Sequence, residues 1–287
     1  MYRVFVTSVF GIILSVAWCS GQANYTQTDS LIFEQYCETF SSKKNLPVSE
    51  LMVESALFFC DSPYVGQTLD IPVKKETLII NLREFDCTTL VENCLALSLT
   101  LKSGDVSFKN FSEYLRKIRY RGGVIDGYTS RLHYSSDWMF EKEKDGFLNN
   151  ISELTGGQKI NKNISFMSTH SSLYPYLKNN PEEIKKIKNI EEKLNKRGGW
   201  YVINKRDILN TNEKIRNGDI ILFSTTISGL DFSHMGIAYK KDGRVTFIHA
   251  SSKAKKVTIE KHNLSQYCTN STKCNGIVLL RINGLKK

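Results

Sequence analysis

The segment Asn81-Leu-Arg-Glu-Phe-Asp-Cys-Thr-Thr-Leu-Val-Glu92 is the most informative part of this chain of 287 residues. An apolar, β-prone run from Thr77 to Leu82 ends in it, and a helical pattern begins at Cys87. Apolar side chains then recur at three- and four-residue spacing as far as Leu101, which predicts a helix with one apolar face. We therefore expect a core helix with a cysteine in its first turn.

A cysteine at this position is a candidate nucleophile. The first turn of a helix carries unpaired backbone N–H groups and the positive end of the helix dipole, which stabilise a thiolate and lower the thiol pKa. The sequence thus predicts a reactive Cys87, and a buried, inert side chain is the alternative.

Two histidines in the second half of the chain are candidates for the base. His234 begins a predicted strand and His249 ends the next one, and a hairpin turn at Asp242-Gly243 makes the two strands neighbours. Gly236 and Ala238 share the strand face of His234, and their small size leaves room there for the helix of Cys87. Either histidine alone would be an ordinary structural residue, but the set predicts acyl-transfer chemistry.

In that chemistry the thiolate of Cys87 attacks an acyl carbon, and His234 holds the proton and passes it to the leaving amine. His249 fixes the tautomer of His234. The backbone N–H of Cys87, at the helix start, stabilises the oxyanion.

The pattern of the whole chain predicts the α+β class, with helices first and an antiparallel meander after Gly218. The predicted helices cover residues 30–40, 49–60, 87–101 and 181–196, with another one capped by Ser107, and the predicted strands cover residues 219–224, 234–239, 245–249, 257–260 and 276–282. The stretch of about 141–206 is interpreted as an elaborated region within a single domain of residues 24–287.

The N-terminus predicts export. Residues 1–23 match a secretory signal peptide, with Arg3 ahead of the apolar segment Val4–Trp18 and small residues after it. A buried first helix is the alternative, and the bulky Trp18 argues against lipoprotein attachment at Cys19. We expect a periplasmic or secreted protein without a membrane span after processing.

The cysteines bear on disulfides and metal binding, and the net charge bears on the kind of partner. The spacing of Cys268 and Cys274 predicts a local disulfide, and Cys37 and Cys60 are candidates for a second one. No C-x-x-C pair occurs, so we expect no metal and no cofactor. The net charge of +10 favours an anionic partner. Nucleic acid is not expected, because export and the lack of a basic-aromatic motif oppose it.

Three segments resemble the motifs of the NlpC-type papain-like cell-wall cysteine hydrolases. They are Asp86–Glu92, Ser233–Gly236 (Ser-His-Met-Gly) and Phe247–Ala250 (Phe-Ile-His-Ala), in the family's order of cysteine, histidine and third polar residue. The resemblance implies a papain-like α+β fold with N-terminal helices, a nucleophile helix packed on an antiparallel sheet, and inserted loops and helices.

Two further segments are similar to the N-acetylmuramoyl-L-alanine amidase branch of that fold. They are Ser62–Gly66 before the cysteine and Arg121–Trp138 after it. The resemblance implies that peptidoglycan fragments (muropeptides) are the substrates and that the amide between N-acetylmuramic acid and L-alanine is hydrolysed through a thioester. Cys87 would be the nucleophile, His234 the base and then the acid, and His249 its orienter.

The predicted substrate-binding residues lie in these same segments and comprise Tyr64, Asp86, Arg131, His133, Tyr134 and Ser233. Arg131 would pair with a carboxylate or with sugar and peptide oxygens, His133 and Tyr134 would supply donors, and Tyr64 would aim its hydroxyl at the substrate carbonyl. The alternatives are a surface salt bridge for Arg131 and core packing for the aromatic residues.

Two other functions compete with the amidase. In the endopeptidase branch, an Asp beside the cysteine and a Ser beside the histidine hold the free amine of L-alanine, and Asp86 and Ser233 occupy those positions. A γ-D-glutamyl-diamino-acid endopeptidase is therefore the nearest rival, and a non-catalytic murein-binding protein is a rival of another class. The segment Arg131–Trp138 and the lack of an accessory wall-binding module favour the amidase, which we expect to be a monomer.

Overall fold

The structure is a computed structural model that describes residues 23–70 and 75–284. The predicted signal peptide, including Cys19, lies outside the described residues except for Ala23. Within the described ranges, no helix is both long and apolar enough to cross a membrane.

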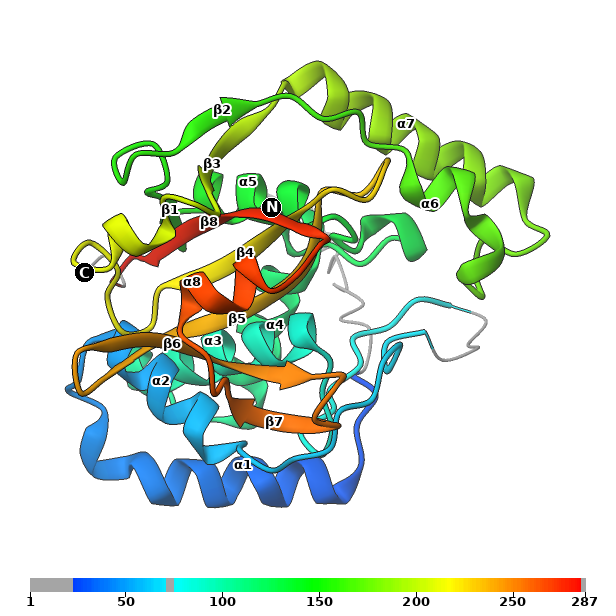
Figure 1. Cartoon of the computed structure of the whole chain (residues 1–287). Helices are drawn as coiled ribbons and strands as arrows, with labels where there is room; N and C mark the ends of the chain where they lie inside the picture. Colours follow the sequence, from blue (N-terminus) through cyan, green and yellow to red (C-terminus); the bar gives the residue numbers. More distant parts are fainter. Residues whose placement is uncertain (1–22, 71–74, 285–287) are drawn as a thin grey trace, which may run out of the picture.

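An antiparallel sheet lies at the centre of the molecule (Figure 1). In the described part of the chain it has eight strands, in the order β2-β3-β8-β4-β5-β6-β7, with β1 paired to β8. The strands are β1 (Leu148–Asn150), β2 (Gln158–Ile160), β3 (Trp200–Asn204), β4 (Ile220–Thr225), β5 (Phe232–Lys241), β6 (Arg244–Ser251), β7 (Lys256–Ile259) and β8 (Cys274–Ile282). The meander predicted after Gly218 is confirmed for β4 to β7, whereas the last predicted strand, β8, returns to pair with β4.

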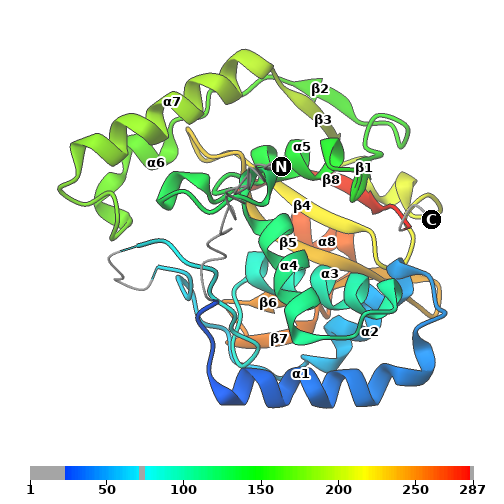
Figure 2. The same ribbon diagram turned by 180° about the vertical axis from the view of Figure 1, so that it is seen from behind.

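Helices cover both faces of this sheet. Figures 1 and 2 show α2, α3 and α4 on one face and α8 on the other. The helices are α1 (Gln27–Phe40), α2 (Val48–Phe58), α3 (Cys87–Ser103), α4 (Phe108–Arg119), α5 (Ser135–Lys144), α6 (Phe166–Thr169), α7 (Pro181–Arg197) and α8 (Leu264–Thr269). Helices packed on an antiparallel sheet confirm the predicted α+β class.

Helix α3 begins at Cys87 as predicted, because Asp86 and Thr89 form a capping box at its N-terminus. The backbone N–H of Thr89 donates to Oδ1 of Asp86 (2.8 Å), and the backbone N–H of Asp86 donates to the Thr89 hydroxyl (2.9 Å). Gly104 ends the helix with a φ of 85°, which suits glycine. All residues of 89–101 are buried, so the helix is covered on every side and not only along one apolar face.

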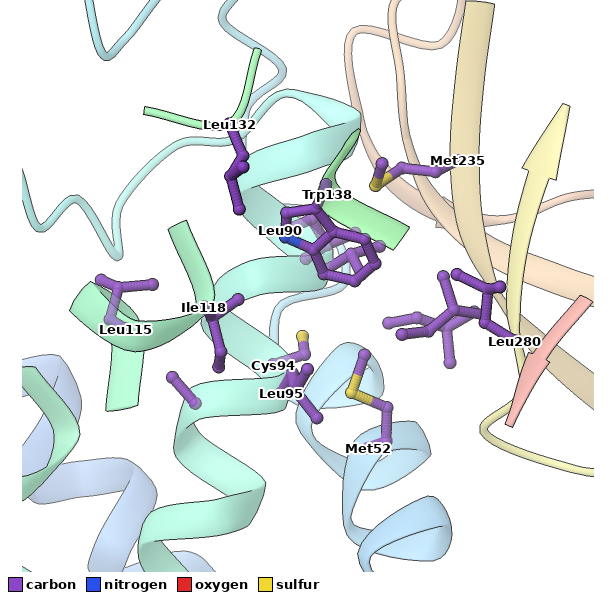
Figure 3. Packing of buried hydrophobic residues seen from close by; sticks show 14 of the residues in the cluster. Met52, Leu90, Cys94, Leu95, Leu115, Ile118, Leu132, Trp138, Met235 and Leu280 are labelled. Carbon is purple, nitrogen blue, oxygen red and sulfur yellow. The ribbon is translucent and has the colours of Figure 1, made fainter. Parts of the chain in front are cut away.

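The contacts of α3 correct the prediction about small residues in β5. Leu90 of α3 and Met235 of β5 belong to the same core cluster (Figure 3), whereas Ala238 belongs to the other cluster. Because side chains alternate along a strand, the helix lies on the face of β5 opposite to Gly236 and Ala238. On the other face, a Cβ added to Gly236 would lie 2.6 Å from Cδ2 of Phe247. The room left by Gly236 is therefore filled by a ring of the neighbouring strand β6, and the prediction that the Cys87 helix fills it is wrong.

The sheet also differs from the predicted one in two places. The stretch 141–206 contributes β1, β2 and β3, and β3 extends the sheet by pairing Ile203 with Ile277 of β8. The β-prone run before the nucleophile helix is not a strand, because only Ile79 forms an isolated bridge, to Asn24.

The cysteines confirm one predicted pair and correct the other. Cys268 and Cys274 form a disulfide that joins the end of α8 to the start of β8, with Cα atoms 5.3 Å apart. Cys37 and Cys60 are free and partly buried, so the candidate pairing between them is wrong.

We expect replacement of both Cys268 and Cys274 by Ser to lower the free energy of unfolding by about 2 kcal/mol, because the cross-link restricts the unfolded chain around a short loop. Chemical denaturation followed by circular dichroism measures the change. The matched control replaces Cys37 and Cys60 by Ser, which breaks no disulfide. Equal midpoints for the wild type and the Cys268/Cys274 variant would contradict the expected role of the disulfide.

Candidate active site

The hairpin of β5 and β6 carries His234 and His249 on neighbouring strands, as predicted. Asp242 and Gly243 both adopt positive φ, 52° and 74°, as a tight two-residue hairpin turn requires. A bulge in β5 leaves Ser233 unpaired, since His234 pairs with Phe223 and the next pairing is made by Phe232. Bulges of this kind redirect side chains next to active sites.

The two histidines form a hydrogen-bonded pair. Nε2 of His234 lies 2.7 Å from Nδ1 of His249, and the ring of Tyr267 lies beside both. Burial, together with the neighbouring His249, lowers the pKa of His234 to about 3. Burial lowers the pKa of His249 to about 4, against the opposing charge of Glu260. Both rings are therefore neutral at pH 7, so one donates and the other accepts.

Cys87 contacts β5 at Met235, the residue that follows His234. The backbone N–H groups of Met235 and of Cys87 itself hydrogen-bond the Cys87 sulfur. The prediction of a lowered pKa is nevertheless wrong, because burial and the negative charge of Asp86 raise the pKa of the thiol to about 11. The free energy needed to remove the thiolate from water is larger than the stabilisation that the helix start and these hydrogen bonds provide. Cys87 is a thiol at neutral pH.

A cavity of about 190 Å³ opens beside Asp86 and Thr88, the two chain neighbours of Cys87. The other residues that line it are Gln67, Leu69, Asp70, Glu92, Arg119, Tyr128, Arg131, Leu132, His133, Tyr134, Met167, Tyr174 and Leu230. They come from the loop before α3, from α3 itself, the end of α4, the segment before α5, the region around α6 and the turn before β5. The cavity thus brings together four of the predicted substrate-binding residues.

Arg131 is buried and pairs within the protein. Its Nη2 lies 2.6 Å from Oδ1 of Asp70, its Nε lies 3.5 Å from Oε1 of Glu76, and Nη1 donates to the carbonyl of Leu69. Two carboxylates already balance its charge, so the prediction that Arg131 pairs with a substrate carboxylate is not supported. Arg131 instead holds the loop of Leu69 and Asp70 against the cavity.

His133 and Tyr134 have different roles in the cavity wall. Burial and the charge of Arg131 lower the pKa of His133 to about 3, so its ring is neutral. Its Nε2–H donates to the carbonyl of Tyr128 (2.8 Å), which leaves Nδ1 as an acceptor. The Tyr134 hydroxyl donates to Oε1 of Glu191 (2.7 Å) and accepts from the Met167 N–H (2.8 Å). Tyr134 therefore holds α6 and α7 against the cavity. Its hydroxyl proton is already donated to Glu191, which does not support the prediction that Tyr134 donates to the substrate.

Tyr64 and Asp86 lie near the thiol, whereas Ser233 lies at the bulge of β5. Burial and the charges of Cys87 and Asp86 raise the pKa of Tyr64, which places its phenol near both. Oδ1 of Asp86 is occupied by the helix cap. Ser233 is exposed at the bulge, and neither Ser233 nor Tyr64 lines the cavity.

Two further residues at the histidine pair were not predicted. Oε2 of Glu260 lies 3.5 Å from Nε2 of His249, and Oε1 of the same carboxylate lies 2.8 Å from Nδ1 of His262. Tyr267, next to the disulfide, covers both histidine rings. The only sequence signal for Glu260 is its place at the end of the strand beside His249.

In the ranges that the structure describes, no three His, Cys, Asp or Glu side chains form a group that could hold a metal ion.

A family model and a solved structure point to the same family. A family model described as N-acetylmuramoyl-L-alanine amidase-like matches residues 54–277. The crystal structure of an N-acetylmuramoyl-L-alanine amidase from Bacteroides uniformis is 41% identical, with a TM-score of 0.76, and the match covers 82% of this chain and 99% of that one.

Two other solved structures are similar. A Bacteroides fragilis protein provisionally described as a xylanase is 40% identical over 80% of this chain and 100% of its own, with a TM-score of 0.75. A Legionella pneumophila protein at 21% identity, with a TM-score of 0.69 over 89% of this chain and 94% of its own, shares the fold. A search of curated proteins finds no significant match.

Proposed function

The chain belongs to the N-acetylmuramoyl-L-alanine amidase-like family, and from this premise we propose that it hydrolyses the amide between N-acetylmuramic acid and L-alanine with Cys87 as nucleophile. The observation that carries the proposal is that the thiol, at the start of a buried helix, is hydrogen-bonded by the backbone of Met235, the chain neighbour of His234. His234 in turn forms a neutral, hydrogen-bonded pair with His249. The three motifs also support an NlpC-type, papain-like arrangement of the fold.

The first half-reaction forms a thioester. Nε2 of His234 is bonded to His249, so Nδ1 is the nitrogen left to receive the Cys87 proton. The proton leaves the thiol as sulfur attacks the lactyl carbonyl, since both groups are neutral beforehand. The backbone N–H of Cys87 stabilises the oxyanion, and His234 then gives its proton to the departing amine of L-alanine.

The second half-reaction returns the enzyme to its starting state. Water enters where the peptide has left, and His234 takes one of its protons as the oxygen attacks the thioester. The C–S bond breaks, the Cys87 sulfur regains the proton, and the carboxylic acid of N-acetylmuramic acid is released. The carboxylate of Asp86 and Nδ1 of His133 border the cavity for the substrate, and the phenol of Tyr64 lies near Cys87 and Asp86.

The proposed substrate also bears on location. Peptidoglycan fragments are met outside the cytoplasm, and a disulfide such as that between Cys268 and Cys274 persists in an oxidising compartment. Both points support export as a single domain of residues 24–287, as the N-terminal sequence predicts.

We expect activity to persist into acid well below pH 6.5. The pKa of His234 is lowered from 6.5 to about 3, so the ring stays an unprotonated base as the pH falls through 6.5 and is lost as a base only near the lower value. The acid limb of kcat/KM should therefore lie closer to pH 3 than to pH 6.5. Circular dichroism at each pH is the control for folding, and an acid limb centred near 6.5 with the fold intact would refute the expectation.

Mass analysis of products tests the choice of bond. With N-acetylmuramyl-L-alanyl-γ-D-glutamyl-diaminopimelate as substrate, the amidase releases the intact peptide with a new L-alanine amine. The same peptide without the sugar is the control and stays uncut. Cleavage of the control after D-glutamate would show the endopeptidase instead, and binding without any product would show a murein-binding protein.

A further inference from the structure

The histidine pair continues into a carboxylate that the proposed mechanism has not used. Nε2 of His249 is a buried atom, and the nearest polar partner recorded for it in the described part of the chain is Oε2 of Glu260 at 3.5 Å. The other oxygen of Glu260 accepts from the backbone N–H of His262 (2.9 Å) and faces Nδ1 of the same residue (2.8 Å). A line of groups thus runs from His234 through His249 to Glu260.

We propose that Glu260 is a positioning residue that fixes the tautomers of both histidines, an inference that rests on the proposed function. A carboxylate can only accept, so it holds His249 with its proton on Nε2. Nδ1 of His249 is then an acceptor, and it holds His234 with its proton on Nε2. Nδ1 of His234 is left with a lone pair for the proton of Cys87.

The environment of Glu260 keeps the carboxylate ionised. Burial alone would raise its pKa, but the hydrogen bonds from the backbone and ring of His262 and the nearby His249 bring the pKa below its usual value. The gap of 3.5 Å to His249 is longer than a normal hydrogen bond, and such contacts in free enzymes tighten as charge develops on the histidine during reaction.

The opposite polarity would disable the base. If His249 carried its proton on Nδ1, it would donate to Nε2 of His234. His234 would then carry its own proton on Nδ1 and present a donor where the thiol needs an acceptor. The choice between a working and a non-working site therefore depends on what Nε2 of His249 faces.

Glu260→Gln and Glu260→Ala together test this role. The glutamine oxygen can keep the bond to the His262 N–H, which turns its NH₂ group toward His249 and imposes the non-working tautomer. We expect kcat to fall by about 10²–10³-fold with KM little changed, because an orienting carboxylate replaced by its amide holds the base in the wrong tautomer. Alanine imposes neither tautomer and should lose less.

A purely structural role predicts the reverse order, because glutamine keeps the shape and one hydrogen bond while alanine keeps neither. Glu113→Gln is the matched control, as it also removes one carboxylate charge from an ion pair, to Arg116 on α4. It should retain the wild-type kcat. A Glu260→Gln variant that is as active as Glu260→Ala, or more so, would overturn the proposal.

A second measurement does not depend on turnover. The chain has five histidines, so ¹⁵N-histidine NMR can resolve the tautomer of His249 in the free enzyme. We expect a protonated Nε2 in the wild type and a protonated Nδ1 in Glu260→Gln. A wild-type His249 protonated on Nδ1 would overturn the proposal even if Cys87 is shown to be the nucleophile, whereas hydrolysis without Cys87 would overturn the proposed function and leave the tautomer result standing.

Discussion

Cys87→Ala is expected to lower kcat by about 10⁴-fold or more, because without the sulfur no thioester forms and water must attack the amide directly. The rate of peptide release from an N-acetylmuramyl-peptide measures the loss. Substrate should still bind, since the cavity is lined by other residues and Cys87 is not among them.

The matched control is Cys94→Ala on the same helix. Cys94 is a buried thiol two turns further along α3, packed in the core, and its loss should leave kcat within a few-fold of the wild type. Unchanged hydrolysis by Cys87→Ala would show that Cys87 is not the nucleophile. Equal losses in both variants would point to damage to α3 instead of lost chemistry.

His234→Ala is expected to lower kcat by about 10³-fold with little change in KM, because His234 both takes the thiol proton and gives it to the leaving amine. Steady-state kinetics on the same substrate measures the two constants separately. His249→Ala should cost less, since that residue acts through His234.

The control for His234 is His170→Ala. His170 is exposed and stacks on Phe166 at the end of α6, outside the cavity wall. It should retain wild-type kinetics. A His234→Ala variant with a raised KM and an unchanged kcat would assign His234 to substrate binding and not to proton transfer.

The parts of this fold that the sequence predicts well are those set by local chemistry. The cap of Asp86 on Thr89 and the glycine at position 104 define α3 from within a few residues. The turn at Asp242 and Gly243 fixes the register of β5 and β6, and so brings His234 and His249 together. Such features need no knowledge of distant contacts.

The parts that the sequence does not predict depend on distant packing. Strands β1 and β2 are three residues long each and gain their partners only from β8 and β3. Glu260 directly follows β7, so its position depends on the register between β6 and β7. That register depends on the connection 252–255, where Lys255 adopts a φ of 60° that the sequence does not predict.

The chemistry of the site shows the same limit. The helix start argues for a lowered pKa of Cys87, but burial and the charge of Asp86 raise it. The sequence predicts that Arg131 binds substrate, but in the structure Arg131 pairs with Asp70 and Glu76. Burial and the positions of opposite charges decide both cases, and both come from tertiary structure.

The acyl group carried by the enzyme during turnover tests the central claim most directly. The wild type is mixed with an N-acetylmuramyl-peptide, quenched in acid within the first turnover and weighed intact, with Cys87→Ala as the blank. We predict an added mass equal to the N-acetylmuramyl group, located on Cys87 after digestion and absent from the blank. An added mass equal to N-acetylmuramyl-L-alanyl-γ-D-glutamyl, or product release by Cys87→Ala at the wild-type rate, would contradict a Cys87-dependent N-acetylmuramoyl-L-alanine amidase.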